Sequence, residues 1–450
     1  MPHARVLVPS GALGLGYDPD ALSRGVAMKP DIIAIDGGST DSGPHYLGTG
    51  TSKYSRATTK SEWAGLMAAR AEAGVPLLIG TAGTCGADSA VDWLTDITRE
   101  TAAETGQRLK IAVLKSGQNA KELEKAYNAG RITALPAAPD ISADTFRSCT
   151  NIVALAGAEH IQAALATGAD IVIAGRTTDT AVLSALPLQR GCHAGAAWHG
   201  AKVGECGALA TTKSGSGVIL LDFDAEGCTL TPMAKGARAT PETVSAHMLY
   251  ENSDPFILHE PGGFLDTHDA KYEAVGDACR ITGSVWHKSD TYTVKLEGAR
   301  KAGFQTVSVV LVREPRYVAH IRQWCADIEA KCTAQASARI GEPFSIELRI
   351  IGLDATLGAL EPTPVAAHEV GVMGIVTAES KAASREVAKM LNPYLLHHPL
   401  TDGESQPTFA FPFSPPEMPR GEVYEFCLHH TLELADPMEA FRLDVIEVGP

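Results

Sequence analysis

The 450-residue chain is long for a single hydrophobic core, so we expect two domains. Its 45% hydrophobic and 20% charged residues are typical of a globular protein, and its net charge of -15 argues against a nucleic-acid partner. No apolar run reaches the roughly 20 residues that span a bilayer. The N-terminus leads into a strand pattern without a secretory leader, so we predict a cytoplasmic protein with no membrane contact.

Four short apolar runs each end in a loop of small and polar residues, near Ser10, Asp36, Gly80 and Gly175. Runs of this kind are typical of buried parallel strands. In an open α/β sheet, ligands bind outside the carboxyl ends of the strands. We therefore expect these loops to converge on one crevice.

Helical patterns alternate with these strands. The segments 60–73, 88–105, 119–129 and 159–167 each end at or near a glycine that precedes or opens an apolar run. This alternation predicts an α/β fold with a doubly wound, mostly parallel sheet over residues 1–230. The pattern of strands and single helices in residues 231–450 predicts a second, smaller α+β domain. Its irregular region 235–289 would form a cap over the crevice.

The segment Asp36–Asp41 is the strongest candidate for ligand contact. Its glycines let the backbone approach a ligand closely, its hydroxyls donate hydrogen bonds, and its carboxylates accept them or hold a proton. The alternative is a tight turn in which Asp36 caps neighbouring amides. We predict Asp36 as an acid or base and, as substrate-binding residues, Gly37, Gly38, Ser39, Thr40 and Asp41.

A second glycine-rich loop, residues 81–88, leads from a strand into a helix. Free amides of Gly83 and Thr84 at that helix start would bind a carboxylate or phosphate oxygen. The same position would lower the pKa of Cys85 and make it a candidate nucleophile or base. The alternative is a packing turn with an inert thiol.

The third loop carries Arg176, Thr177, Thr178 and Asp179. Arg176 would clamp a carboxylate, with the two threonines beside it, and Asp179 would transfer a proton. The alternative is a mutual salt bridge that fixes the loop.

Glu205 is the fourth candidate catalytic residue. His199, Lys202 and Glu205 are spaced three apart, so on a helix they share one face. The alternative is an exposed helical face with ion pairs.

The sequence gives little support for a metal or cofactor. The nine cysteines are scattered singly without a Cys-x-x-Cys pair, which favours reduced thiols. The paired histidines at 397–398 and 429–430 would point to opposite faces of a strand. The glycines of Ser10–Gly16 fall short of a dinucleotide-binding pattern, so we predict no metal and no nicotinamide or other cofactor.

Segments 36–48, 175–188, 205–208 and 290–299 lie in the order found in one known family. On these segments the chain resembles the acyclic terpene utilisation family, the AtuA-like proteins, across most of its length. The resemblance implies a cytoplasmic protein linked to catabolism of branched unsaturated acids or their coenzyme A thioesters. It supplies no set of catalytic residues.

Together these features predict a cofactor-independent lyase, hydratase or isomerase. It would act by proton transfer on a small carboxylic acid or its acyl-CoA thioester, and we expect a homo-oligomer. One alternative is a thiol-dependent hydrolase or acyl transferase that uses Cys85. Another is a non-catalytic subunit that binds an acyl ligand within a larger complex.

Overall fold

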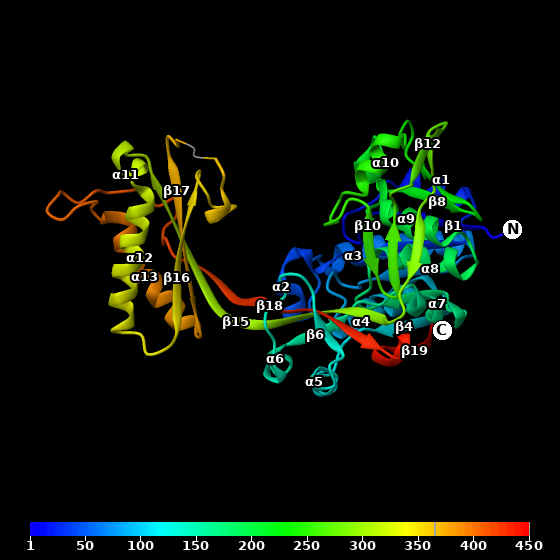
Figure 1. Ribbon diagram of the computed structural model, residues 1–450, viewed down its shortest axis with the longest axis horizontal. Helices are drawn as coiled ribbons and strands as arrows, with labels where there is room; N and C mark the ends of the chain where they lie inside the picture. Colours follow the sequence, from blue (N-terminus) through cyan, green and yellow to red (C-terminus); the bar gives the residue numbers. More distant parts are fainter. Residues whose placement is uncertain (364–365, 450) are drawn as a thin grey trace. The chain divides into compact units, whose positions relative to one another are not determined.

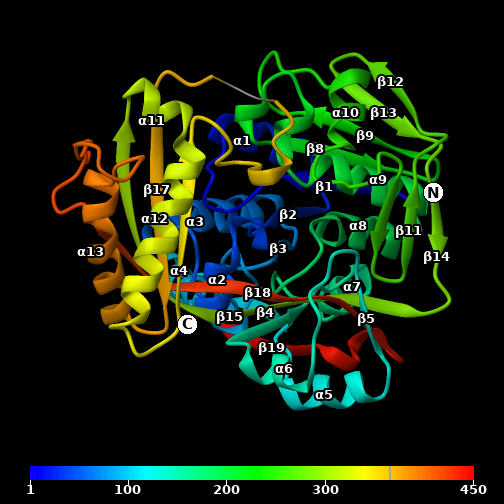
Figure 2. The same ribbon diagram turned by 60° about the vertical axis from the view of Figure 1, so that its left-hand side comes forward.

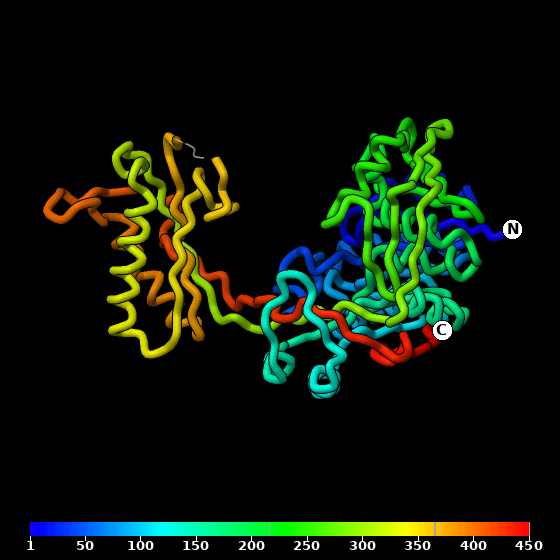
Figure 3. Tube along the Cα trace, viewed as in Figure 1, coloured from blue at the N-terminus to red at the C-terminus, as the bar shows by residue number. Residues whose placement is uncertain are grey.

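The computed structural model describes residues 1–363 and 366–449 (Figure 1). The chain forms two compact units: unit 1 comprises Met1–Arg300 with Phe426–Pro450, and unit 2 comprises Lys301–Glu425. Unit 2 is thus one continuous stretch of chain, drawn from yellow to orange-red in Figure 3. Residues 231–300, which the sequence assigned to the second domain, lie in unit 1.

The main sheet of unit 1 has ten strands in the order β12-β13-β9-β8-β1-β2-β3-β7-β4-β19. The strands β1, β2, β3, β7 and β4 pair in parallel, and antiparallel strands flank them on both sides. The bounds are β1 Ala4–Val8, β2 Ile32–Asp36, β3 Leu77–Gly80, β4 Leu109–Lys115, β7 Ile171–Ala174, β8 Ile219–Phe223, β9 Gly227–Pro232, β12 Lys271–Val275, β13 Ala278–Thr282 and β19 Arg442–Val448. The predicted α/β class is confirmed, with a mixed sheet that is parallel at its centre.

Apolar side chains cover both faces of the parallel strands, which explains their unbroken hydrophobic runs. Along β2, Ile33 and Ile35 join one buried cluster with residues of α1, α3 and α4, whereas Ile32 and Ala34 join another with residues of α7, α8 and α9. The helices of this unit are α1 Pro19–Ala27, α2 Pro44–Thr49, α3 Arg56–Ala73, α4 Asp88–Thr105, α5 Ala120–Asn128, α6 Ala143–Ser148, α7 Ala158–Ala166, α8 Asp179–Gln189, α9 Ala194–Gly204 and α10 Pro241–His247.

The predicted glycine stops are present. Helices α3 and α4 end at Gly74 and Gly106, whose φ angles of 68° and 67° lie in the left-handed region that glycine adopts without strain. Each helix therefore ends where the sequence indicated.

The region 235–289 is not irregular, contrary to the sequence prediction. It contains α10, two strands of the main sheet and a separate three-stranded sheet, β10-β11-β14, that packs against α9 (Figure 2). The small sheet consists of β10 Ile257–Glu260, β11 Gly263–Asp266 and β14 Val285–Lys288. The sequence pattern does not predict these strands, because they are short and partly exposed and therefore lack a continuous apolar run.

Two long strands, β15 Tyr292–Val312 and β18 Met418–Leu434, run from one unit into the other. In unit 1, β15 pairs with β6 Asn151–Ala154 and β18 pairs with β5 Ile132–Ala134. Short 3-10 segments complete the described chain: η1 Thr40–Ser42, η2 Gly207–Ala210, η3 Ser214–Ser216, η4 Gly358–Leu360 and η5 Pro437–Ala440.

Unit 2 has α+β character, as expected for the second domain. Antiparallel pairing joins β15 to β17 Val370–Ala378 and β17 to β16 Phe344–Ile351. Helices α12 Ile321–Ser337 and α13 Lys381–His397 pack on these strands, with α11 Pro315–Ala319 before them (Figure 1). Their apolar side chains form a separate core around Trp324 and Leu391.

Candidate active site

Hydrogen bonds tie together the loops that follow β2, β3 and β7. The Gly37 amide donates to the Gly80 carbonyl at 2.8 Å, and the Thr81 amide donates to the Gly175 carbonyl at 2.8 Å. These strands are parallel neighbours, so their carboxyl ends lie along one edge of the sheet. The Leu13 amide donates to the Asp36 carbonyl at 3.0 Å and joins the loop after β1 to them, so the four loops lie together as expected.

The loops after β2 and β3 approach too closely for side chains at the contact. A Cβ atom on Gly37 would lie 2.3 Å from the Thr81 carbonyl oxygen. Thr81 and Thr84 have φ angles of 45° and 78°, which β-branched residues rarely adopt. The Thr81 hydroxyl accepts a hydrogen bond from the Thr177 amide at 3.3 Å, which helps to hold this conformation. Backbone strain of this kind concentrates at functional sites.

Arg176 is buried and its guanidinium is paired with protein acceptors. Its Nε donates to Glu297 Oε2 at 3.0 Å, and its Nη1 donates to the Thr177 carbonyl at 3.1 Å and lies 3.6 Å from Asp179 Oδ1. Burial disfavours the charged form of Arg176. The negative charges of Glu297 and Asp179 outweigh this effect and raise the pKa of Arg176. The guanidinium thus holds this loop in place, which is the alternative considered from the sequence. Its N–H groups are not free to bind the carboxylate of a ligand.

Glu297, on β15, is the partner that the sequence interpretation missed. Burial disfavours its charge, yet Arg176 and Lys295 hold its pKa at about 2. Lys295 Nζ lies 2.9 Å from Oε1, and the Thr40 hydroxyl donates to Oε2 at 2.9 Å. Lys295 and Glu297 are two residues apart on a strand and share one face, a signal that was visible in the sequence.

Asp36, at the end of β2, is buried, and its two carboxyl oxygens differ. Oδ2 accepts a hydrogen bond from the Gly38 amide at 3.0 Å, whereas Oδ1 has no partner among the described residues. Burial raises the pKa of Asp36 well above its usual value, and the negative charge of Asp179 adds to the rise. Asp36 therefore keeps its proton to a higher pH than an exposed aspartate does.

Asp179 begins α8, and its side chain is 27% exposed. Burial raises its pKa, while Arg176 and Lys202 lower it. The two aspartates predicted from separate loops thus lie close enough to influence each other's ionisation.

Lys202 and Glu205 share one face of α9, as their spacing predicted, but that face is buried. Lys202 Nζ donates to Glu205 Oε1 at 2.6 Å, and both side chains are 5% exposed. Burial raises the pKa of Glu205 to about 8, and Asp179 adds to the rise, while the Lys202 ammonium opposes it. The exposed ion-paired face considered as an alternative is wrong.

His199 belongs to the core. Its ring nitrogens lie 2.6 Å from the Ser284 hydroxyl and 3.1 Å from the Tyr272 hydroxyl. Burial lowers the pKa of His199 to about 4, so the ring is neutral at pH 7.

Glu260, at the end of β10, is an acidic group that the sequence did not single out. The Thr180 hydroxyl donates to its Oε1, and its Oε2 is buried without a partner among the described residues. Burial raises the pKa of Glu260 to about 7, and Asp179 contributes to the rise. The region expected to be an irregular cap thus supplies a carboxyl near the predicted acids.

Cys85 does not fit the reactive thiol that the sequence suggested. It is 1% exposed and lies ahead of α4, whose N-cap is Ala87. Burial raises the pKa of Cys85, although Arg176 opposes the rise. The expected lowering of its pKa by the helix start is wrong, because loss of hydration outweighs that effect.

Several predicted ligand-binding hydroxyls cap backbone instead. Ser39 accepts a hydrogen bond from the Asp41 amide at 3.2 Å, and Thr178 accepts one from the Ala181 amide at 3.2 Å. Over the described chain, the amides of Gly83 and Thr84 donate no hydrogen bond. Both residues are buried, and α4 begins only at Asp88, so the prediction that these amides open the helix is wrong.

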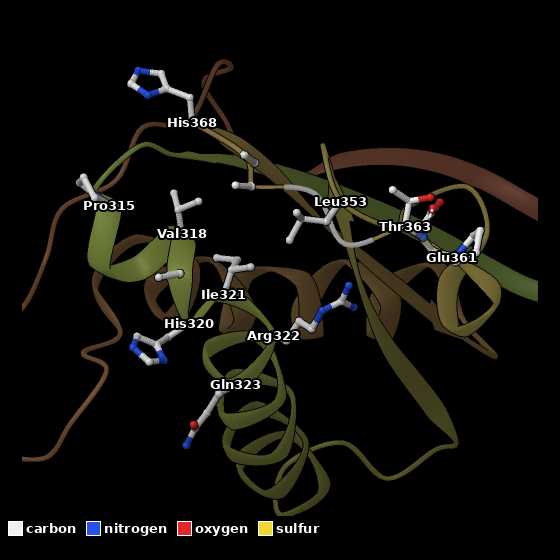
Figure 4. A pocket seen from close by; sticks show the side chains of 14 residues that line it. Pro315, Val318, His320, Ile321, Arg322, Gln323, Leu353, Glu361, Thr363 and His368 are labelled. Atoms are coloured by element: carbon white, nitrogen blue, oxygen red, sulfur yellow. Dashed lines mark hydrogen bonds between the residues drawn. The ribbon is translucent and has the colours of Figure 1, made fainter.

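A separate groove of about 690 Å³ lies in unit 2. Figure 4 shows Val318, Ile321 and Leu353 directed toward its centre, while His320 and Gln323 point outward. Among the described residues, its lining includes none of the candidate residues named above, although it does include Glu361 and His368.

The family model described as acyclic terpene utilisation family protein AtuA matches residues 78–413. The chain belongs to this family. The matched range covers the loops after β3 and β7, Glu205 and Glu260, and the resemblance seen in the sequence is confirmed. No curated protein and no solved structure matches this AtuA-family chain. In its described residues, no helix is both long and apolar enough to cross a membrane.

Proposed function

We propose that the protein is an enzyme that transfers a proton at the carbon next to a carbonyl, as a lyase, hydratase or isomerase. Its membership of the AtuA family supports a role in the catabolism of acyclic terpenes. Its substrate would be a small branched or unsaturated carboxylic acid or its coenzyme A thioester.

The proposal rests on two carboxyl groups. In each of them one oxygen accepts a hydrogen bond, and the other has no hydrogen-bond partner within the described chain. Asp36 is held through the Gly38 amide and Glu260 through Thr180, and the second oxygen of each is buried without a partner in the described chain. Leaving a buried polar atom unpaired costs about 1–3 kcal/mol, so such atoms need an explanation. A bound substrate group that gives or accepts a proton would supply the missing partner of each oxygen.

The environments of the aspartates suggest their roles. Asp36 is the more deeply buried and would carry the proton as a general acid. Asp179 is partly exposed and lies near Arg176 and Lys202, so it would ionise first and act as the base. Two acids whose surroundings push their pKa values apart are the usual basis of such a division.

Substrate binding would use groups other than Arg176. The amides of Gly83 and Thr84 would contact an oxyanion or carboxylate, because they donate no hydrogen bond within the described chain. Arg176 would act indirectly, by fixing the loop that carries Asp179.

The first test is a thermal-shift screen of the full chain against small di- and tricarboxylic acids and their coenzyme A thioesters. The compound that stabilises the protein is then incubated with it in deuterium oxide. We expect deuterium to enter the carbon next to the carbonyl, and we expect Asp36→Asn and Asp179→Asn each to slow this exchange by about 100-fold or more.

Asp96→Asn is the matched control, because Asp96 is an exposed acid on α4 paired only with Arg99 among the described residues. It should exchange at the wild-type rate. Unchanged exchange in both site variants would contradict the proposal. Binding without exchange or turnover would instead support the acyl-binding subunit.

A further inference from the structure

A cluster of three different metal-binding groups lies beside the proposed acids. One oxygen of Glu205, the Cys206 sulfur and one ring nitrogen of His247 all lie within 4.8 Å of one another. Glu205 and Cys206 follow the end of α9, and His247 is the last residue of α10. No local sequence pattern reveals this group, because about 40 residues separate the histidine from the other two.

The histidine itself points to a ligand. His247 is 7% exposed, and its Nε2 is buried without a hydrogen-bond partner among the described residues. A buried ring nitrogen left in this state costs free energy unless something binds it. No protein group in the described chain forms a hydrogen bond with His247 Nε2.

Glu205 retains an oxygen for coordination. Its Oε1 accepts the hydrogen bond from Lys202, and Oε2 makes no hydrogen bond within the described residues. The carboxylate can therefore keep its lysine while Oε2 binds a cation.

The local charge balance favours a cation. The Glu205 carboxyl interacts electrostatically with Asp179 and Glu260, and the Cys206 thiol with Asp179 and Glu251. Lys202 is the nearby cation among the groups that interact with them in this way. A divalent ion with a thiolate adds one net positive charge to a region where acidic groups outnumber cations. It therefore favours the ionised form of these carboxyl groups.

The elements that carry the ligands are fixed by packing. Val203 and Ala208 flank the first pair, Val244 and Met248 flank the histidine, and all four are buried in the same apolar cluster. Zinc bonds of about 2.0–2.3 Å place tetrahedral ligand atoms roughly 3.5 Å apart, so closure needs only small side-chain rotations.

We propose that Glu205, Cys206 and His247 bind a divalent transition-metal ion, with zinc as the best match to an oxygen, sulfur and nitrogen set. Magnesium and calcium prefer oxygen ligands alone. Three protein ligands leave a fourth position open, as in catalytic zinc sites, where the ion can polarise an oxygen of a bound acid. This replaces the expectation, drawn from the sequence, that the protein has no metal.

Cobalt(II) tests the sulfur ligand directly. The full chain is stripped with a chelator, dialysed and titrated with Co²⁺, and we expect one equivalent to produce a near-ultraviolet thiolate-to-cobalt absorption that Zn²⁺ abolishes. Cys206→Ser should remove this band, and His247→Asn should weaken Zn²⁺ binding by at least tenfold. Cys192→Ser, a buried thiol elsewhere in unit 1, should leave both unchanged.

A second measurement needs no variant and is independent of turnover. Alkylation by a maleimide, mapped by mass spectrometry, should be slowed at Cys206 by Zn²⁺ but not by Mg²⁺. Alkylation of Cys206 without added metal is the reference. Failure to bind stoichiometric Zn²⁺, or a cobalt band that persists in Cys206→Ser, would overturn the metal site. Neither result would affect the exchange test of the proposed reaction.

Discussion

Unpaired buried oxygens are the residue-level feature that separates this site from ordinary polar packing. Asp36 Oδ1 and Glu260 Oε2 both lie in protein interior without hydrogen bonds from the described chain. Groups of this kind lower stability, and selection retains them mainly where function needs them. Glu260 gives the cleaner test, because its other oxygen is held by a side chain and not by a loop amide.

The substitution Glu260→Gln should stabilise unit 1 at pH 8 but not at pH 5. Burial raises the pKa of Glu260 from 4.5 to about 7, so the native state holds this proton more tightly than the unfolded chain. The associated stability is complete below pH 4.5 and is lost as pH rises through about 7. A neutral glutamine avoids that loss, so we expect a gain on the order of 2 kcal/mol at pH 8. Urea unfolding at both pH values measures the difference.

Glu226→Gln is the control, because Glu226 is an exposed acid in the same unit. Its effect should be small and equal at the two pH values. If Glu260→Gln changed stability equally at pH 5 and pH 8, the carboxyl would not be titrating as its burial requires.

At the level of elements, local sequence patterns predicted strands and helices correctly, whereas pairings between residues far apart in the sequence could not be predicted. The apolar runs ending near Asp36, Gly80 and Gly175 correctly located three parallel strands, because a strand buried on both faces needs an unbroken apolar run. The spacing of Lys202 and Glu205 correctly placed them on one helical face. Burial of that face could not be predicted, because it depends on strands that come later in the chain.

The partners of the site residues show the same limit. Glu297 binds Arg176 across 121 positions of sequence, and Glu260 reaches Thr180 across 80. No local pattern encodes such pairings. The Cys85 prediction failed for a related reason, since loss of hydration depends on the whole surrounding core.

Gly37→Ala tests the close contact between two loops. The added Cβ would lie 2.3 Å from the Thr81 carbonyl oxygen and 2.8 Å from that of Gly80, and backbone atoms cannot rotate away. We expect a loss of at least about 2 kcal/mol in the stability of unit 1, together with a loss of proton exchange. Gly215→Ala is the control, because among the described residues no atom outside its chain neighbours and its own helical backbone lies within 4 Å of the position that its Cβ would take. Wild-type stability in Gly37→Ala would show that the loops can separate without cost.

At the level of the whole molecule, unit 2 has a core of its own, separate from the buried clusters of unit 1. This core around Trp324 and Leu391 consists entirely of residues of unit 2, whereas the candidate acids and the proposed metal ligands all belong to unit 1. A chain whose units have separate cores need not unfold in one step. A ligand that binds residues of unit 1 can stabilise only the native state of that unit directly.

Calorimetry should therefore resolve two unfolding transitions, and substrate-class acids or Zn²⁺ should raise only one of them. Leu391→Ala should lower the other by about 2–5 kcal/mol, because Leu391 is fully buried in the core of unit 2. Leu66→Ala, equally buried in unit 1, should lower the ligand-sensitive transition. A single transition that both substitutions lower and the ligand raises would mean that the units unfold together, and stability measured at the site would then report on the entire chain.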